Sequence, residues 1–133
     1  MVGIVVVSHS KKLAQEAIEL AKEMKMYDFP LINGSGTDGD FLGSNPLFIK
    51  EAIEKAYTEN GVIIFVDIGS SVLNSKIAFD LLEDNIDKEK IKIADAPLVE
   101  GLIGAVAIND KKATIKTILE ELAEFKNLSK LVY

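Results

Sequence analysis

The chain of 133 residues contains no cysteine, no tryptophan and only one histidine. The absence of cysteine excludes disulfide bonds, a thiol nucleophile and any metal site built on thiolates. The absence of tryptophan, together with an aromatic content of only 7%, argues against an aromatic-rich flavin pocket. Sulfur chemistry at cysteine is therefore excluded, and imidazole chemistry has a single candidate.

The sequence is also poor in positive charge and has no long apolar run. Its net charge is -6 and its pI is about 4.8, whereas binding to nucleic acid or to anionic lipid requires a basic surface. The apolar run at residues 2–7 is too short for a membrane span or a signal peptide, and no positive residue precedes it. We therefore expect a cytoplasmic protein whose partners are small molecules or proteins, not nucleic acids or membranes.

Strand and helix patterns alternate along the chain. Apart from Gly3, residues 2–7 form a run of β-branched side chains, which is typical of a strand buried on both faces. Residues 11–24 then show helical spacing, and the apolar face comprises Leu13, Ala17, Ile18, Ala21 and Met24. The further predicted strands are 29–32, 62–66 and 91–94, and the further predicted helices are 47–57, 72–82, 96–108 and 113–125.

This alternation predicts one α/β domain over residues 1–133, with an open, mostly parallel sheet of about four strands and helices on both faces. The chain is long enough for one well-buried core and too short for two ordinary domains. Ligands bind such sheets at the carboxyl ends of the strands. Residues 8–10, the glycine-rich loop after the second strand and residues 67–71 should share that edge, whereas residues 126–133 have too little pattern to place.

The glycine-rich loop contains Gly34, Gly36 and Gly39 at the G-x-G-x-x-G spacing of a dinucleotide-binding turn. That turn must follow the first strand and open a helix directly, so that the pyrophosphate meets free backbone N–H groups. Here the glycines follow the second strand, and the next helix begins only near Pro46. The context therefore disfavours a dinucleotide site.

Other interpretations of this loop remain. A flexible connection is the simplest, although the loop is long for this fold class. A metal site at Asp38 and Asp40 is disfavoured, because calcium-loop spacing requires another oxygen ligand where Leu42 stands, and we predict no metal site. Alternatively, the glycines let backbone N–H groups turn towards a phosphoryl group, while Ser35 and Thr37 offer hydroxyls.

His9 lies between a predicted buried strand and the N-terminus of the next helix. A single histidine in a sequence is ordinarily interpreted as a surface residue without a functional role. The position of His9 at the ligand-binding edge, between Ser8 and Ser10, favours a functional one. The unbonded N–H groups that open the following helix can receive an anion delivered to the ring.

Asp67 follows the third predicted strand at the same edge and should lie near His9. A carboxylate bonded to one ring nitrogen fixes the tautomer and leaves the other nitrogen unprotonated and nucleophilic, which suits a phosphoryl acceptor. A helix cap or a turn residue before Gly69 is an equally good interpretation of Asp67 taken alone. Ser70 and Ser71 are typical of helix N-caps and could equally donate to a phosphoryl group.

Four segments of the chain together resemble a known family. They are GIVVVSHS at 3–10, GSGTDGDFLGS at 34–44, VDIGSSVLN at 66–74 and APLVEGLIGA at 96–105. In this order and spacing, the chain resembles over nearly its whole length the enzyme IIA-like phosphoryl-donor subunits of phosphoenolpyruvate-dependent dihydroxyacetone kinase. These subunits are related to the mannose-type enzyme IIA of the phosphotransferase system.

The resemblance implies that His9 takes a phosphoryl group from the histidine-containing phosphocarrier protein. His9 would pass it to ADP on the nucleotide-binding kinase subunit, whose ATP phosphorylates dihydroxyacetone on a third subunit. Asp67 would orient His9, and the candidate phosphoryl-binding residues are Ser10, Gly36, Thr37, Ser70 and Ser71. We expect no cofactor on this chain, since ADP, ATP and magnesium would belong to the partner. Some relatives carry phosphocarrier and enzyme I-like domains on the same chain, whereas here we expect separate donors.

Two other functions remain open: enzyme IIA of a mannose-family sugar transporter, and a non-catalytic domain that binds a small ligand or a partner. A receiver-type switch is disfavoured, because Ser8 and His9 stand where its acidic pair would be. The almost wholly apolar helix at 98–108 fits either burial within one domain or a homodimer interface. The family resemblance favours the homodimer.

Overall fold

The computed structural model describes residues 1–131 and confirms the α/β fold. The strands are β1 (Gly3–Val7), β2 (Leu31–Asn33), β3 (Val62–Val66) and β4 (Ile91–Ile93). The helices are α1 (Lys11–Lys22), α2 (Pro46–Ala56), α3 (Gly69–Leu81), α4 (Leu98–Ile108) and α5 (Ile115–Ala123), and short 3-10 turns cover Lys88–Lys90 and Glu124–Asn127. All strand pairs are parallel, in the order β2-β1-β3-β4.

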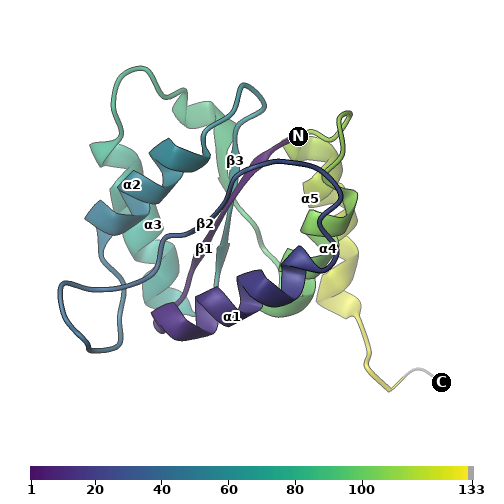
Figure 1. The fold of residues 1–133 in the computed structure, drawn as a ribbon, viewed down its shortest axis with the longest axis horizontal. Helices are drawn as coiled ribbons and strands as arrows, with labels where there is room; N and C mark the ends of the chain where they lie inside the picture. Colours follow the sequence, from purple (N-terminus) through teal and green to yellow (C-terminus); the bar gives the residue numbers. More distant parts are fainter. Residues whose placement is uncertain (132–133) are drawn as a thin grey trace.

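The sheet separates two helical layers (Figure 1). Figure 1 shows α2 and α3 on one side of the sheet and α4 and α5 on the other, with α1 in contact with α4. Successive side chains of a strand point to opposite faces, so Ile4 and Val6 enter the core under α1 and α4, whereas Val5 and Val7 enter the core under α2. The continuous apolar runs of β1 and β3 are therefore explained by burial on both faces.

The second strand starts two residues later than predicted. Pro30 lacks an N–H group for the sheet, and its carbonyl accepts a hydrogen bond from Ile4 N–H before pairing starts at Leu31. Phe29, which was predicted to belong to this strand, instead inserts its ring into the core, with Lys25 Nζ at 4.7 Å from the ring centre. The strand was predicted to start too early because Phe29 is apolar, but its side chain packs in the core and the residue does not pair in the sheet.

The buried face of α1 was only partly predicted. Leu13 and Met24 are each 47% exposed, so both predictions were wrong. The buried face comprises Ala14, Ala17, Ile18 and Ala21. Because most of these side chains are small, the helix approaches α4 and the sheet closely, and the larger apolar residues are left at its margins.

The apolar helix α4 is largely covered within the chain. Gly101, Leu102, Ala105 and Val106 are buried, and a Cβ atom at Gly104 would lie 2.7 Å from the Phe125 ring. Packing inside one domain therefore accounts for most of the apolar character of α4, which gives no separate support for a homodimer.

The ends of α4 and α5 differ slightly from the predicted bounds. Pro97 holds the N-cap position of α4, and the hydroxyl of Thr114 caps α5 in a reciprocal capping box. Beyond α5, Lys126 pairs with Asp95 at 2.7 Å and Lys130 with Glu100 at 2.9 Å. The rest of the unassigned tail, residues 132–133, lies outside the described residues.

Within residues 1–131, every helix is too short or too polar to cross a bilayer.

Candidate functional site

His9 and Asp67 meet where the order of the strands reverses. After β1, the chain crosses to β2 on one side and later returns to β3 on the other, so the crevice opens between the carboxyl ends of β1 and β3. Val7 and Val66 are partners in the sheet, and His9 and Asp67 follow them closely. His9 Nδ1 lies 3.0 Å from Asp67 Oδ1. The expected proximity of the two residues is confirmed.

The Asp67 carboxylate accepts five hydrogen bonds from the part of the chain that the structure describes. The donors are the His9 backbone N–H, His9 Nδ1, the hydroxyls of Ser8 and Ser71, and the Ile68 backbone N–H. Burial of the carboxylate raises the pKa of Asp67, but the hydrogen bonds together outweigh burial and hold the pKa well below its usual range. Asp67 is therefore an ionised, acceptor-only partner for the imidazole.

The two ring nitrogens of His9 have different surroundings. Nδ1 faces the Asp67 carboxylate, which can only accept, so this nitrogen carries the proton. Nε2 contacts the hydroxyl of Ser70, which is exposed. The His9 side chain is 26% exposed. The ring is thus fixed on its buried side and presents Nε2 on its open side, and in the neutral ring with its proton on Nδ1 this nitrogen has a free lone pair.

The two candidate serines at the start of α3 occupy different environments. The helix begins at Gly69, three residues before the predicted start, and the N-cap position is Ile68, without a side-chain cap. The interpretation of Ser70 and Ser71 as N-caps was therefore wrong, because both lie in the first helical turn. Ser71 is fully buried and its hydroxyl lies 2.7 Å from Asp67 Oδ1, which does not support contact with a phosphoryl group, whereas Ser70 is at the surface.

The first residues of the glycine-rich loop have structural tasks. Gly34 N–H donates to the Val6 carbonyl at 2.8 Å, so it is not free to meet a phosphoryl group. The Ser35 hydroxyl is buried and accepts the Ser8 backbone N–H at 2.8 Å. The expectation that these two residues face a phosphoryl group was wrong, because β2 extends its pairing with β1 into the start of the loop.

The rest of the loop surrounds the open side of the site. Gly36 has a φ of +116°, which favours glycine. The Thr37 hydroxyl lies 3.0 Å from the carbonyl oxygens of Gly39 and Phe41, so it holds the loop's own backbone. Gly43 N–H donates to the His9 carbonyl at 2.7 Å, which ties the end of the loop to the histidine.

An open groove of about 920 Å³ lies beside His9, between the start of α1 and residues 36–42. Ser10 borders the groove, and its hydroxyl caps α1 by accepting the Leu13 N–H at 3.2 Å. Lys11 and Lys12 line the same groove. We did not anticipate these lysines from the sequence, although their position directly after His9, at a helix start, was a usable signal.

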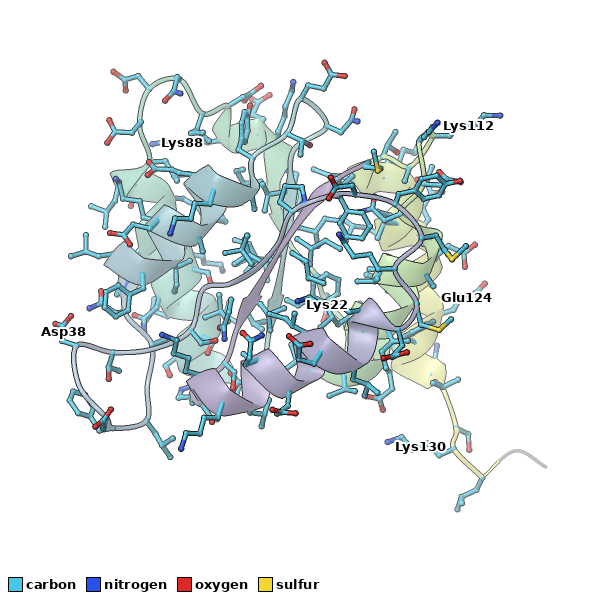
Figure 2. All side chains as sticks on the ribbon, viewed as in Figure 1. Lys22, Asp38, Lys88, Lys112, Glu124 and Lys130 are labelled. Carbon is cyan, nitrogen blue, oxygen red and sulfur yellow. The ribbon has the colours of Figure 1, made fainter. Side chains whose placement is uncertain are left out.

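Asp38 and Asp40 are exposed on the loop opposite the lysines. Figure 2 shows Asp38 on the part of the loop that projects away from the helices. Within residues 1–131, no group of three or more histidine, aspartate and glutamate side chains is arranged to hold a metal ion.

Comparison with known proteins shows the family of the chain. The EIIA-man family model, described as the phosphotransferase-system (PTS) fructose IIA component, matches residues 3–120. The chain is 37% identical over 122 residues to the phosphoryl donor subunit DhaM of the PEP-dependent dihydroxyacetone kinase 2 of Listeria innocua, covering 92% of this chain and 97% of that protein. It is 34% identical over 124 residues to the DhaM subunit of Klebsiella michiganensis, covering 91% of this chain but only 26% of that protein.

The fold has a counterpart among solved structures. The phosphotransferase system component EIIA from Streptococcus agalactiae superposes with a TM-score of 0.68 at 12% identity, covering 98% of this chain and 97% of that one. At this identity, the likeness concerns the fold alone. The family match and the Listeria relative show that the chain belongs to the mannose-type enzyme IIA (EIIA-man) family of the phosphotransferase system.

Proposed function

We propose that this chain is a phosphohistidine carrier and that His9 Nε2 carries the phosphoryl group. The observation on which the proposal depends is the oriented imidazole: Nδ1 lies 3.0 Å from Asp67 Oδ1, and Nε2 is on the open side of the ring. The names of the relatives, phosphoryl donor subunits of dihydroxyacetone kinase, support the same role.

In this proposal, the phosphoryl group is transferred to His9 and then from His9 to the acceptor. The Nε2 lone pair attacks phosphorus, a P–N bond forms, and the bond between phosphorus and the donor's histidine breaks. His9 keeps its proton on Nδ1, so the phosphorylated ring is cationic and the Asp67 carboxylate stabilises it. When the acceptor attacks phosphorus, the P–N bond breaks and neutral imidazole leaves. Positioning and electrostatics supply most of the catalysis in such transfers.

Ser70 is the residue that we assign to the phosphoryl group itself. Its hydroxyl contacts Nε2 and would donate to a phosphoryl oxygen once Nε2 is occupied. Gly36, Thr37 and Ser10 border the groove through which the group arrives, and Lys11 adds a positive charge there. Ser71 acts instead on Asp67, to which its hydroxyl is bonded.

The proposed partners are those that the family resemblance implies, and the relatives' names support only a dihydroxyacetone kinase as the wider complex. The donor is the histidine-containing phosphocarrier protein, and the acceptor is ADP on the nucleotide-binding subunit of dihydroxyacetone kinase. ADP, ATP and magnesium belong to that subunit in this proposal, and this chain binds none of them. We further propose that it works as a homodimer in the cytoplasm.

A second candidate is the enzyme IIA of a sugar transporter. The family description as a fructose IIA component favours it. The two candidates share the chemistry at His9 and differ only in the acceptor, so the acceptor decides between them.

The deciding experiment starts from this protein carrying a radiolabelled phosphoryl group on His9. Addition of ADP with the nucleotide-binding kinase subunit should convert the label into ATP. Addition of the enzyme IIB of a mannose-type transporter should leave most of the label in place. Transfer to enzyme IIB without formation of ATP would identify the chain as a transporter component.

A further inference from the structure

Ser8 is a fully buried residue of the site, and it takes no direct part in the proposed phosphoryl transfer. Its hydroxyl lies 2.9 Å from Asp67 Oδ2 and accepts the Ser10 backbone N–H at 3.0 Å. The ionised carboxylate can only accept and the backbone N–H can only donate. The direction of both hydrogen bonds is therefore fixed, and Ser8 is a permanent donor to Asp67.

The backbone holds Ser8 in this position. Ser8 directly follows Val7 on β1, as Asp67 directly follows Val66 on β3, and the two valines are partners in the sheet. The Ser8 backbone N–H also donates to the buried hydroxyl of Ser35 at 2.8 Å. Strand register and the start of the glycine-rich loop together place the Ser8 hydroxyl beside the carboxylate.

The two oxygens of Asp67 have separate sets of donors. Oδ1 receives His9 Nδ1 at 3.0 Å, the Ser71 hydroxyl at 2.7 Å and the Ile68 N–H at 2.7 Å. Within residues 1–131, Oδ2 receives only the His9 backbone N–H at 2.8 Å and the Ser8 hydroxyl at 2.9 Å. Without Ser8, Oδ2 keeps one of these two donors, and rotation of the carboxylate away from His9 Nδ1 becomes easier.

We propose that Ser8 is a positioning residue: its buried hydroxyl fixes the rotation of the Asp67 carboxylate and thereby keeps the proton of His9 on Nδ1. The effect on phosphoryl transfer rests on the proposed function. The effect on the imidazole tautomer does not, because it concerns this chain's own residues before any phosphoryl group arrives.

The tautomer can be measured directly, since the chain has one histidine and selective ¹⁵N-histidine labelling gives one pair of ring signals. In the parent protein with a neutral ring, Nδ1 should carry the proton. In Ser8→Ala, the two ring shifts should move towards each other as the tautomers mix. Ser75→Ala is the matched control: Ser75 is also fully buried, but its hydroxyl donates to the Ser71 carbonyl at 2.7 Å, so the parent shifts should persist.

The rate of His9 phosphorylation gives the second measurement. Mutation of a group that orients a metal-bound histidine typically lowers metal affinity or activity by about 10- to 100-fold. Ser8 orients His9 through Asp67 in a similar way, so we expect Ser8→Ala to slow labelling by about tenfold. Ser8→Thr, which keeps a hydroxyl, should recover most of the loss. In an Asp67→Asn background, Ser8→Ala should add less than about twofold, because it acts through Asp67.

Parent-like ring shifts in Ser8→Ala, or rate losses that multiply in the double variant, would overturn the proposal. If Ser8→Ala does not fold, Ser8→Cys, which fills the same space with a weaker donor, takes its place in both measurements. Failure of the parent protein to accept label on His9 would contradict the proposed function and would leave the tautomer measurement as the test of Ser8.

Discussion

The two nitrogens of His9 divide the chemistry of the site between them. Nδ1 binds Asp67, whose low pKa keeps the carboxylate ionised, and Nε2 meets only the exposed Ser70 hydroxyl among the described hydrogen-bond partners. An imidazole held in this way needs no proton transfer to accept or release a phosphoryl group. In the proposed transfer, the proton stays on Nδ1 throughout, and the positive charge that the ring gains on phosphorylation lies beside the Asp67 carboxylate.

Asp67→Asn should fold and yet transfer the phosphoryl group roughly a hundredfold more slowly. The amide removes the negative charge and can donate to Nδ1, which favours the wrong tautomer. Rapid-mixing measurements of labelling on purified protein check the rate. Asp84→Asn, which changes an exposed carboxylate outside the site, should keep the parent rate. Equal rates for Asp67→Asn and the parent protein would contradict the role given to Asp67.

At the residue scale, the sequence predicted correctly which side chains meet where their positions depend on the ends of strands. His9 and Asp67 follow long apolar runs whose ends are visible in the sequence, so their proximity could be inferred. The environments of Ser71 and Thr37 could not be inferred from the sequence, because these environments depend on the first turn of α3 and on the path of the loop. The donor role of Ser8 required the register of β1 against β3.

At the scale of elements, the close packing of β1 against α2 fixes the strand that His9 follows. The buried face of α2 comprises Ile49, Ala52, Ile53 and Ala56. Gly3 lies where β1 passes the last turn of this helix: a Cβ atom there would stand 1.8 Å from the Ala56 carbonyl oxygen. That contact is with backbone, which cannot move aside as a flexible side chain can.

Gly3→Ala should therefore lower the free energy of unfolding by about 3 kcal/mol, near the upper end of the usual cost of overpacking. Urea denaturation checks the value. Gly69→Ala is the control, since a Cβ atom at Gly69 has no neighbour within 4 Å, and it should change stability by less than about 1 kcal/mol. Similar stabilities for Gly3→Ala and Gly69→Ala would show that β1 is not packed as described.

At the scale of the whole molecule, the sequence predicted the layers of the fold but not the strand order. Alternating apolar strands and amphipathic helices are sufficient for a parallel sheet covered on both faces. The order β2-β1-β3-β4 depends on which side each crossover takes, and local patterns do not carry that information. The order matters for function, because it places the ends of β1 and β3 side by side.

The homodimer is a prediction at this scale. Burial of α4 within the chain explains the apolar run that first suggested pairing, so the expectation now rests on the family resemblance. Sedimentation equilibrium at micromolar concentration should give twice the chain mass of 14.5 kDa. A mass of one chain across that concentration range would contradict it.

The carrier proposal is tested most directly by labelling the protein with phosphoenolpyruvate, enzyme I and the histidine-containing phosphocarrier protein. We predict one label per chain, on His9, which is lost in acid and kept in base, as expected of a P–N bond. His9→Ala should abolish the label without unfolding the protein, and ATP alone should give none. Direct labelling from ATP, or an acid-stable label on Ser10, Thr37 or Ser70, would contradict the carrier role of His9.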